Sequence, residues 1–383
     1  MRLARRLPHA VSIAAMLTGS PWAQESHLPE VEVRGPRDAT IGSADSASEG
    51  AAEREVFQAR PKLRPGDIIE AVPGVVATQH SGDGKANQYF LRGFNLDHGT
   101  DFSMKVDGMP VNMPTHGHGQ GYADLNFLIP ELVSGVSYRK GPYFADNSDF
   151  ALAGSATIDY LSALDAPFAE VTFGSNDYRR LLAAGSRTVQ DQTWLGAVEL
   201  VGNDGPWDVP ENLRKANALL RYSQGSPTRG FSITGMAYKS RWNATDQVPE
   251  RLIASGELPR FGSLNATDGG ESQRYSLSGK WFDRSESGQT QVNVYAMAYR
   301  FDLFSDFTYF LNNPVNGDQF EQTDRRNVFG AEASHQMPNK LGALDGVLSF
   351  GAQWRGDRIG EVGLYNTEAR QRLSTVRNDK VAQ

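Results

Sequence analysis

Residues 274–281 have the sequence Arg-Tyr-Ser-Leu-Ser-Gly-Lys-Trp, and this stretch indicates the fold. Its side chains form an apolar series, Tyr275, Leu277, Gly279 and Trp281, that alternates with a polar series, Arg274, Ser276, Ser278 and Lys280. Successive side chains of a β-strand point to opposite faces, whereas a helix repeats every 3.6 residues. The stretch therefore predicts a strand with one apolar and one polar face.

The same alternation recurs through the C-terminal part of the chain. We expect strands over 168–174, 178–188, 192–202, 214–224, 229–240, 271–283, 289–301, 325–337 and 346–358, with a tenth beginning near 376. The intervening gaps alternate between short and long, except for a short first gap at 175–177. Strands of about ten residues with this pattern are typical of membrane β-barrels. A water-soluble β-sandwich is the alternative, but its strands usually have five or six residues.

Composition narrows the classes of protein that fit. Hydrophobic residues make up 39% of the 383 residues, and no apolar run is long enough for a membrane-spanning helix. The absence of cysteine excludes disulfide scaffolds, thiolate metal sites and cysteine nucleophiles. A net charge of -7 argues against nucleic acid as a partner, because phosphate binding needs clustered Lys and Arg.

The N-terminus has the pattern of a secretory signal peptide over 1–23. Arg2, Arg5 and Arg6 precede a short apolar run at 10–17, and Ala23 precedes the expected cleavage point. An amphipathic surface helix is the alternative. Residues 24–55 are polar and predict a flexible arm, with one short alternating segment at 28–35.

Residues 56–165 lack the long alternating segments of the C-terminal part and predict a mixed α+β domain. A short helix is expected over 65–72, strands over 87–92, 103–107 and 135–140, and a helical turn and loop over 122–133. Glycines end most of these segments, as expected where turns need a positive φ. About 110 residues are enough to fold around a core of their own.

The chain resembles the TonB-dependent outer-membrane receptors. The resemblance is carried by five segments that fall in the order of the family's plug motifs: DIIEAVPGV at 67–75, LRGF at 91–94, VDGMPVN at 106–112, RKGP at 139–142 and AGSATID at 153–159. It implies an α+β plug domain over 56–165, followed by an antiparallel transmembrane β-barrel from 166. Family barrels have 22 strands, so residues 166–383 would supply an incomplete barrel, and we expect a fragment or a truncated reading frame.

The resemblance also implies particular contacts. The family's TonB box matches Pro29, Glu30, Val31, Glu32, Val33 and Arg34, where a short alternating segment suits strand addition to TonB. An unstructured linker is the alternative. Family plug arginines contact barrel glutamates. Arg92 matches one such position, Lys140 stands at the other with Arg139 beside it, and the expected partners are Glu199 and Glu332.

Four of the seven histidines lie between 80 and 118, and the segment THGHGQG at 115–121 is the most distinctive. His116 and His118 would project to the same side of an extended segment, and imidazole binds zinc, copper, nickel and iron. By the resemblance, this segment faces the ligand, so the expected ligand-binding residues are His98, Asp101, His116 and His118, with His116 and His118 as metal ligands. A glycine-rich loop with structural histidines is the alternative.

These observations predict a monomeric receptor of the bacterial outer membrane, surrounded by lipid and driven by TonB and its inner-membrane motor complex. The expected cargo is a scarce nutrient, with a ferric siderophore or another metal complex as the family default and no permanently bound cofactor. No enzyme motif is present, and a metal hydrolase built on His-x-His would lack a general base. A non-transporting adhesin or porin would explain the strands but not the plug motifs.

Overall fold

The computed structural model describes residues 11–15, 46–58, 64–342 and 344–383. The predicted TonB box, Pro29 to Arg34, lies outside the described residues, and so does most of the predicted signal peptide. Within the described residues, no helix has the length and apolar character needed to span a membrane.

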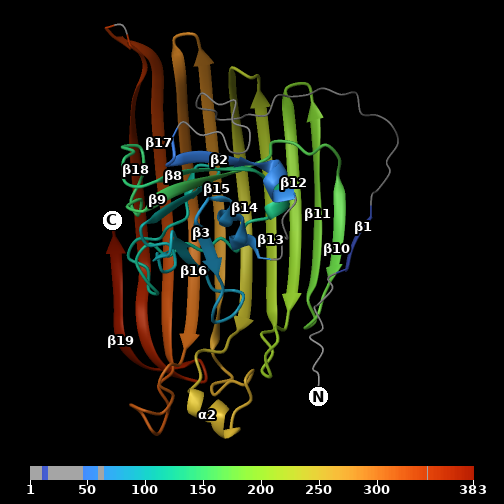
Figure 1. Cartoon of the computed structure of the whole chain (residues 1–383), viewed down its shortest axis with the longest axis vertical. Coiled ribbons are helices and arrows are strands. Elements are labelled where there is room, and N and C mark those ends of the chain that lie inside the picture. Colours follow the sequence, from blue (N-terminus) through green and yellow to red (C-terminus); the bar gives the residue numbers. More distant parts are fainter. Residues whose placement is uncertain (1–10, 16–45, 59–63, 343) are drawn as a thin grey trace.

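A large antiparallel sheet dominates the structure (Figure 1). Its strands follow in chain order: β1 (Val11–Ala15), β10 (Phe168–Phe173), β11 (Arg179–Val189), β12 (Gln192–Asn203), β13 (Leu213–Gly225), β14 (Arg229–Asn243), β15 (Gly269–Ser285), β16 (Gly288–Ser305), β17 (Phe320–Leu341), β18 (Leu344–Glu368) and β19 (Gln371–Ala382). From β10 onward each strand pairs with the next along the chain. The predicted antiparallel meander is therefore confirmed.

Several strands are longer than the alternation alone indicated. β18 continues to Glu368, and β19 already begins at Gln371, because Ala369 and Arg370 form a tight turn with positive φ. β1 lies within the predicted signal peptide and pairs with β10 at the edge of the sheet.

The connections define two ends of the large sheet. Three turns of two or three residues, at 190–191, 226–228 and 286–287, lie at one end of the sheet, where Leu341 of β17 also pairs with Leu344 of β18; we call this the short-turn end. The connections 204–212, 244–268 and 306–319 lie at the opposite, long-loop end, together with helix α2 (Glu250–Ser255) (Figure 1). The predicted alternation of short and long connections is present as far as β18, with the predicted exception at 174–178, and the two-residue turn at 369–370 is a second short connection at the long-loop end.

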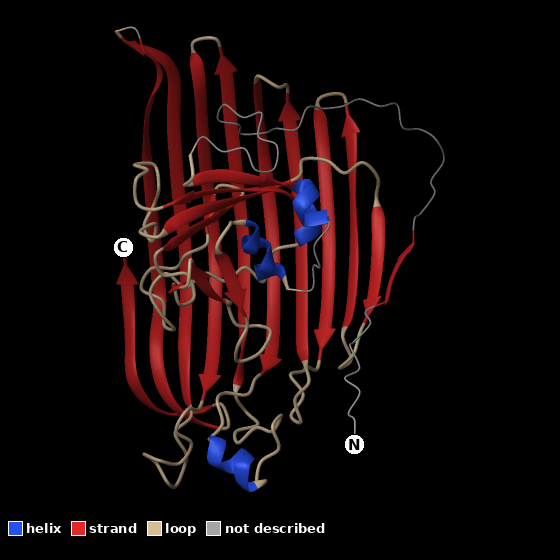
Figure 2. Cartoon of the chain, viewed as in Figure 1, coloured by secondary structure: helices blue, strands red, loops and turns tan. Residues whose placement is uncertain are grey.

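An α+β domain lies against one face of the large sheet (Figure 2). Its five-stranded sheet has the order β2 (Glu49–Glu53), β8 (Val133–Lys140), β9 (Gly154–Tyr160), β6 (Phe102–Val106) and β7 (Met109–Pro110), and its three-stranded sheet contains β3 (Val75–Thr78), β4 (Gln88–Leu91) and β5 (Phe94–Asn95). The helices are α1 (Arg54–Gln58), η1 (Pro65–Ala71) and η2 (Pro130–Leu132). Among the described strands, β6 and β9 are the one parallel pair.

Two local predictions for this domain differ from the structure. Residues 49–53, expected to belong to the flexible arm, form β2, whose partner is β8. Its sequence, EGAAE, has no β-branched or aromatic residue to indicate a strand. In the predicted helical turn over 122–133, only the three residues of η2 are helical.

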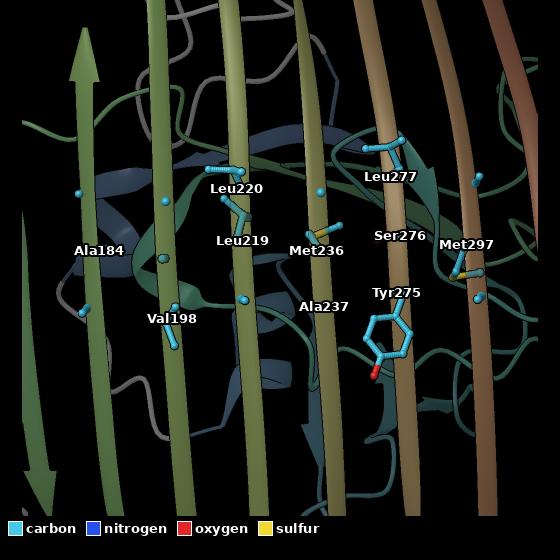
Figure 3. A pocket seen from close by; sticks show the side chains of 18 of the residues that line it. Ala184, Val198, Leu219, Leu220, Met236, Ala237, Tyr275, Ser276, Leu277 and Met297 are labelled. Carbon is cyan, nitrogen blue, oxygen red and sulfur yellow. The ribbon is translucent and has the colours of Figure 1, made fainter.

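The core follows the alternation. Buried side chains of the α+β domain, among them Phe102, Met104 and Ile158, pack toward the inward face of the large sheet, which presents Leu195, Leu219 and Met297. The outward face instead carries exposed apolar side chains. Figure 3 shows Val198, Leu220, Tyr275 and Leu277 along a shallow trough that is also lined by several alanine and glycine residues. An outward apolar face is what strands in contact with lipid require.

One close approach fixes the position of the domain on the sheet. The segment 82–84 lies on the buried indole of Trp242 in β14, and a Cβ added to Gly84 would lie 1.9 Å from the ring. Gly84→Ala is therefore expected to cost about 1–3 kcal/mol of stability through overpacking. Thermal unfolding of the variant measures this cost. Gly196→Ala in β12 is the control, since its nearest contacts would be at 3.9 Å; equal losses in both variants would contradict the expectation.

Candidate functional site

Histidines of the α+β domain gather at the long-loop end. The ring centroids of His80 and His98 are 5.2 Å apart, and those of His98 and His118 are 4.8 Å apart. His98 Nδ1 lies 3.0 Å from the backbone oxygens of Ala86 and Asn87, and His118 Nδ1 lies 2.7 Å from Gln322 Oε1 of β17. Side chains from three separate segments therefore form one group, which we call the histidine cluster (His80, His98 and His118).

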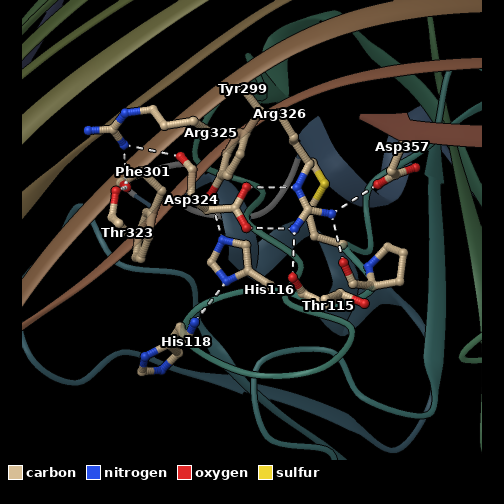
Figure 4. Close-up of polar contacts among 12 residues, drawn as sticks. Thr115, His116, His118, Tyr299, Phe301, Thr323, Asp324, Arg325, Arg326 and Asp357 are labelled. Carbon is tan, nitrogen blue, oxygen red and sulfur yellow. Dashed lines mark hydrogen bonds and ion pairs between the residues drawn. The ribbon is translucent and has the colours of Figure 1, made fainter. Parts of the chain in front are cut away.

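His116 does not belong to this cluster. Its ring stacks on Tyr122 with a centroid distance of 4.3 Å, and its Nε2 lies 3.3 Å from the Tyr299 hydroxyl (Figure 4). The backbone N–H of His118 donates to His116 Nδ1, so the segment turns between the two residues instead of being extended. The prediction that both imidazoles lie on the same side of an extended segment is therefore wrong.

A buried arginine of β17 holds this loop in place. Arg326 donates to the backbone oxygens of Pro114 and Thr115, and its guanidinium also pairs with Asp324 and Asp357 at 2.6 and 2.9 Å (Figure 4). All three charged side chains are almost completely buried. The loop that carries His116 and His118 is thus fastened to the large sheet by charge-assisted hydrogen bonds.

Burial keeps the histidines neutral. It lowers the pKa of His98 and of His118 to about 3, with Lys85 adding to both shifts, and it holds the pKa of His116 well below its usual range. Burial also lowers the pKa of Lys85 to about 8. Neutral imidazole is the form that binds metals and accepts hydrogen bonds.

These pKa values predict an acid-sensitive domain. Between about pH 6.5 and pH 3 the unfolded chain binds protons at His98 and His118 that the folded chain excludes, so stability falls as the pH falls. The slope is at most about 1.4 kcal/mol per pH unit for each histidine. Thermal unfolding at pH 7.5 and pH 5 measures the loss, and His98→Asn/His118→Asn should reduce it. A loss of the same size in this variant would assign the pH dependence to other groups.

Carboxylates of the long loops lie close to the histidine cluster. Ser81, next to His80, donates to Asp246 at 2.9 Å, and the backbone N–H of Asp83 donates to Glu211. Burial, with Asp83 nearby, raises the pKa of Glu211 to about 7. Among the described residues, however, no group of three or more His, Cys, Asp or Glu side chains is arranged to hold a metal ion.

Asp101, another predicted ligand-binding residue, lies in a turn before β6, and its backbone oxygen accepts a hydrogen bond from the backbone N–H of Ala153.

Buried ion pairs near the short-turn end connect the domain to the sheet. The carboxylate of Asp107 accepts hydrogen bonds from Arg221 of β13 and Thr234 of β14, both at 2.9 Å, and pairs with Lys280 of β15 at the same distance. Lys280 also pairs with Asp159. We call Asp107 with Arg221, Thr234 and Lys280 the Asp107 clasp. The two cations hold the pKa of Asp107 well below its usual range despite its burial.

Two further contacts connect the domain to the sheet. Arg180 of β11 forms a bidentate pair with Glu131 and also contacts Glu199, which in turn pairs with Lys215. Lys105 pairs with Glu332 of β17 at 2.9 Å. Acidic side chains of the domain thus meet basic side chains of the sheet in two of the three places.

The structure places the predicted contact residues differently. Glu332 does meet the domain, but its partner is Lys105 rather than Arg92, Arg139 or Lys140. Arg92 is exposed in the turn between β4 and β5, Arg139 pairs with Asp146 and Glu49 inside the domain, and Lys140 lies over the Tyr138 ring. The alternation alone could have indicated Arg221 and Lys280, because both are charged residues on the inward series of their strands.

Comparison with known proteins gives matches for both the α+β domain and the large sheet. Residues 42–155 match the TonB-dependent receptor plug domain family. Among solved structures, the chain is similar to the unliganded ferric citrate transporter FecA, with 12% identity and a TM-score of 0.68 over 87% of this chain and 51% of that one. It is also similar to the copper transporter OprC, with 11% identity, a TM-score of 0.63, and 87% and 50% of the two chains covered.

A third similar structure is the siderophore receptor PirA from Acinetobacter baumannii, with 15% identity, a TM-score of 0.58, and 82% and 48% of the two chains covered. The chain therefore spans about half the length of these structures. Proteins of the TonB-dependent receptor family are transporters of the outer membrane rather than enzymes. The chain therefore contains a TonB-dependent receptor plug domain, and the strands that follow it have the fold of the N-terminal half of the barrels in these structures.

Proposed function

We propose that the protein is a monomeric outer-membrane receptor that binds a scarce nutrient at the long-loop end and imports it into the periplasm under the action of TonB. The observation that carries this proposal is the seating of a plug domain against the inward face of barrel strands through buried ion pairs. Such a plug closes the barrel at rest and has to be moved by work from outside. The outward apolar side chains fit a surrounding of outer-membrane lipid.

The ligand we propose is a metal complex, of which a ferric siderophore is one form. The histidine cluster supports this assignment, because neutral imidazoles are both metal-binding groups and flat surfaces for a chelator. The described residues offer no cage for a bare ion, which favours a metal that arrives in its own chelate. Three of the similar structures are a ferric citrate transporter, a copper transporter and a siderophore receptor, so metal chelates are the first compounds to test.

Uptake by intact cells tests the proposal. Cells with and without the gene, in strains with and without TonB, are supplied with ⁵⁵Fe-labelled ferric citrate, ⁵⁵Fe-labelled ferric enterobactin or ⁶⁴Cu(II). Accumulation that needs both the gene and TonB supports import. Binding to the surface that is unchanged by loss of TonB would instead support a non-transporting outer-membrane protein or adhesin, and no binding at all would support a receptor that has lost its function.

His118 is the residue of the histidine cluster whose loss should affect the ligand most directly. His118→Ala removes a half-buried imidazole without removing a charge, so we expect at least a tenfold loss of chelate uptake with normal assembly in the membrane. His335→Ala is the control, since His335 lies on β17 and contacts Thr290 instead of the histidine cluster. Unchanged uptake by the His118 variant would remove the histidine cluster from the ligand site.

A further inference from the structure

A row of buried polar side chains lies between plug and barrel on the inward faces of β14 and β15. We call this row the β14–β15 seam. Its members are Tyr238, Ser240 and Trp242 of β14 and Ser272, Arg274, Ser276 and Ser278 of β15. Tyr238 pairs in register with Arg274, and Ser240 with Ser272, so the side chains form successive rungs. At 3.3–3.4 Å per residue, Ser272 to Ser278 spans about 20 Å.

Polar atoms of the seam lack partners. The hydroxyls of Ser272, Ser276 and Ser278, the indole N–H of Trp242, and Nε and Nη2 of Arg274 make no hydrogen bond to any described residue, whereas the Tyr238 hydroxyl interacts with Ser240. Buried polar groups are nearly always hydrogen-bonded, and each exception costs about 1–3 kcal/mol. A continuous row of exceptions along one strand pair, within a plug–barrel contact that is otherwise well paired, indicates a surface made for something other than the resting plug.

Arg274 is the most unusual member of the seam. Its side chain is 3% exposed, and its guanidinium lies 4.2 Å above the plug residue Phe127 without an ion pair to any described carboxylate. Asp124 of the plug lines the same small cavity but forms no ion pair with Arg274, and burial raises its pKa to about 6. A buried cation without a close partner is costly, so the site favours an acceptor group that brings negative charge.

The two ends of the seam are closed at rest. Gly82 and Gly84 of the plug cover Trp242 at the long-loop end, and the Asp107 clasp holds the rungs beyond Ser278 at the short-turn end. The cavity between them measures only about 10 Å³, room for a single water-sized group. Passage of a larger ligand therefore requires the plug to move away from β14 and β15.

We propose that the β14–β15 seam is the wall along which the ligand leaves the plug, with Arg274 as a binding station for anionic oxygen groups. The inference rests on the proposed import function and narrows its ligand to a hydrophilic compound that presents negatively charged oxygens. Hydroxyls on successive rungs can form hydrogen bonds with such a ligand one after another as it moves, so that no single position binds it tightly. An apolar ligand would gain nothing from this wall.

Thiol chemistry tests the seam without any knowledge of the ligand. These 383 residues contain no cysteine, so Ser276→Cys introduces a single thiol into them. The protein is treated in cells with an active TonB system, in which the plug can move, with methanethiosulfonate reagents of similar size, one carrying a sulfonate and one a trimethylammonium group. Ser223→Cys is the matched control, because Ser223 is also a buried inward serine but accepts a hydrogen bond from Arg221.

We expect the anionic reagent to modify Ser276→Cys at least fivefold faster than the cationic reagent does. The anionic reagent should also modify Ser276→Cys at least tenfold faster than Ser223→Cys. Arg274→Gln should abolish the preference for the anion, and Arg274→Lys should retain it. The proposal would be overturned if Ser276→Cys were modified as slowly as Ser223→Cys, or if the two reagents modified Ser276→Cys at equal rates. Neither outcome depends on the Arg274 variants. The uptake assay is separate: absence of TonB-dependent uptake with an anion-selective seam would refute only the import function.

Discussion

An Asp107→Asn variant is expected to lose about 3–5 kcal/mol of plug stability, because the substitution leaves Arg221 buried without a counter-charge and leaves Lys280 with Asp159 alone. The shape of the side chain is retained, so the loss reports charge rather than packing. Thermal unfolding in detergent and the rate of protease cleavage within the plug both measure it. The same reasoning predicts that the clasp weakens in strong acid, as the pH approaches the lowered pKa of Asp107 and the carboxylate is protonated.

The control for this variant is Asp283→Asn. Asp283 pairs with Arg229 at 2.6 Å, but the arginine side chain is 70% exposed, so the pair contributes at most about 1 kcal/mol. A second variant, Asp107→Asn/Arg221→Met, removes the buried cation that has lost its counter-charge and should recover part of the lost stability. Equal losses for Asp107→Asn and Asp283→Asn would show that the clasp does not hold the plug.

Arg326→Met is expected to have an effect of similar size on the loop that carries His116 and His118. The substitution leaves Asp324 and Asp357 buried close together and removes the donors to the backbone oxygens of Pro114 and Thr115. We expect a loss of about 3–5 kcal/mol. Because the loop then loses its attachment, chelate binding at the surface should fall together with stability.

Two comparisons separate loop attachment from general damage. Arg325→Met changes the next residue of the same strand, whose partner Asp302 lies outside the loop, and should leave chelate binding intact. The triple variant Arg326→Met/Asp324→Asn/Asp357→Asn removes the repulsion between the two carboxylates but does not restore the missing donors. It should therefore recover stability without recovering chelate binding. Recovery of both would mean that the loop does not depend on Arg326 for its position.

The strands of the large sheet could be predicted from the sequence because the alternation of apolar and polar residues is a local property of each strand. The segment 274–281 reveals both its strand and its inward series, and the inward series later proves to face the plug. The ends of strands were less predictable: β18 and β19 meet in a two-residue turn at Ala369 and Arg370, where no glycine or proline marks the boundary. Strand β2 was missed because it is formed by pairing with β8 and not by its own residue preferences.

The candidate site was predictable only in part. His98 and His118, both predicted as ligand-binding residues, have ring centroids 4.8 Å apart, and their role toward a ligand stays a prediction. His116 could not be placed correctly, because its partners Tyr122 and Tyr299 come from other segments. The family resemblance pointed to Arg92 and Lys140 for contacts with the barrel, whereas this chain uses Lys105, Asp107 and Glu131.

The position of β2 determines where mechanical load would first act on the plug. This five-residue strand lies at the edge of its sheet, and its pairing within the sheet is with β8 alone. Tension applied to the chain ahead of Glu49 reaches the pairing of Glu49 with Arg139 before any other strand pair of the domain. Hydrogen bonds broken one after another from an end resist far less force than bonds loaded together. A pull on the N-terminal side would therefore peel β2 away while β6, β8 and β9 remain paired.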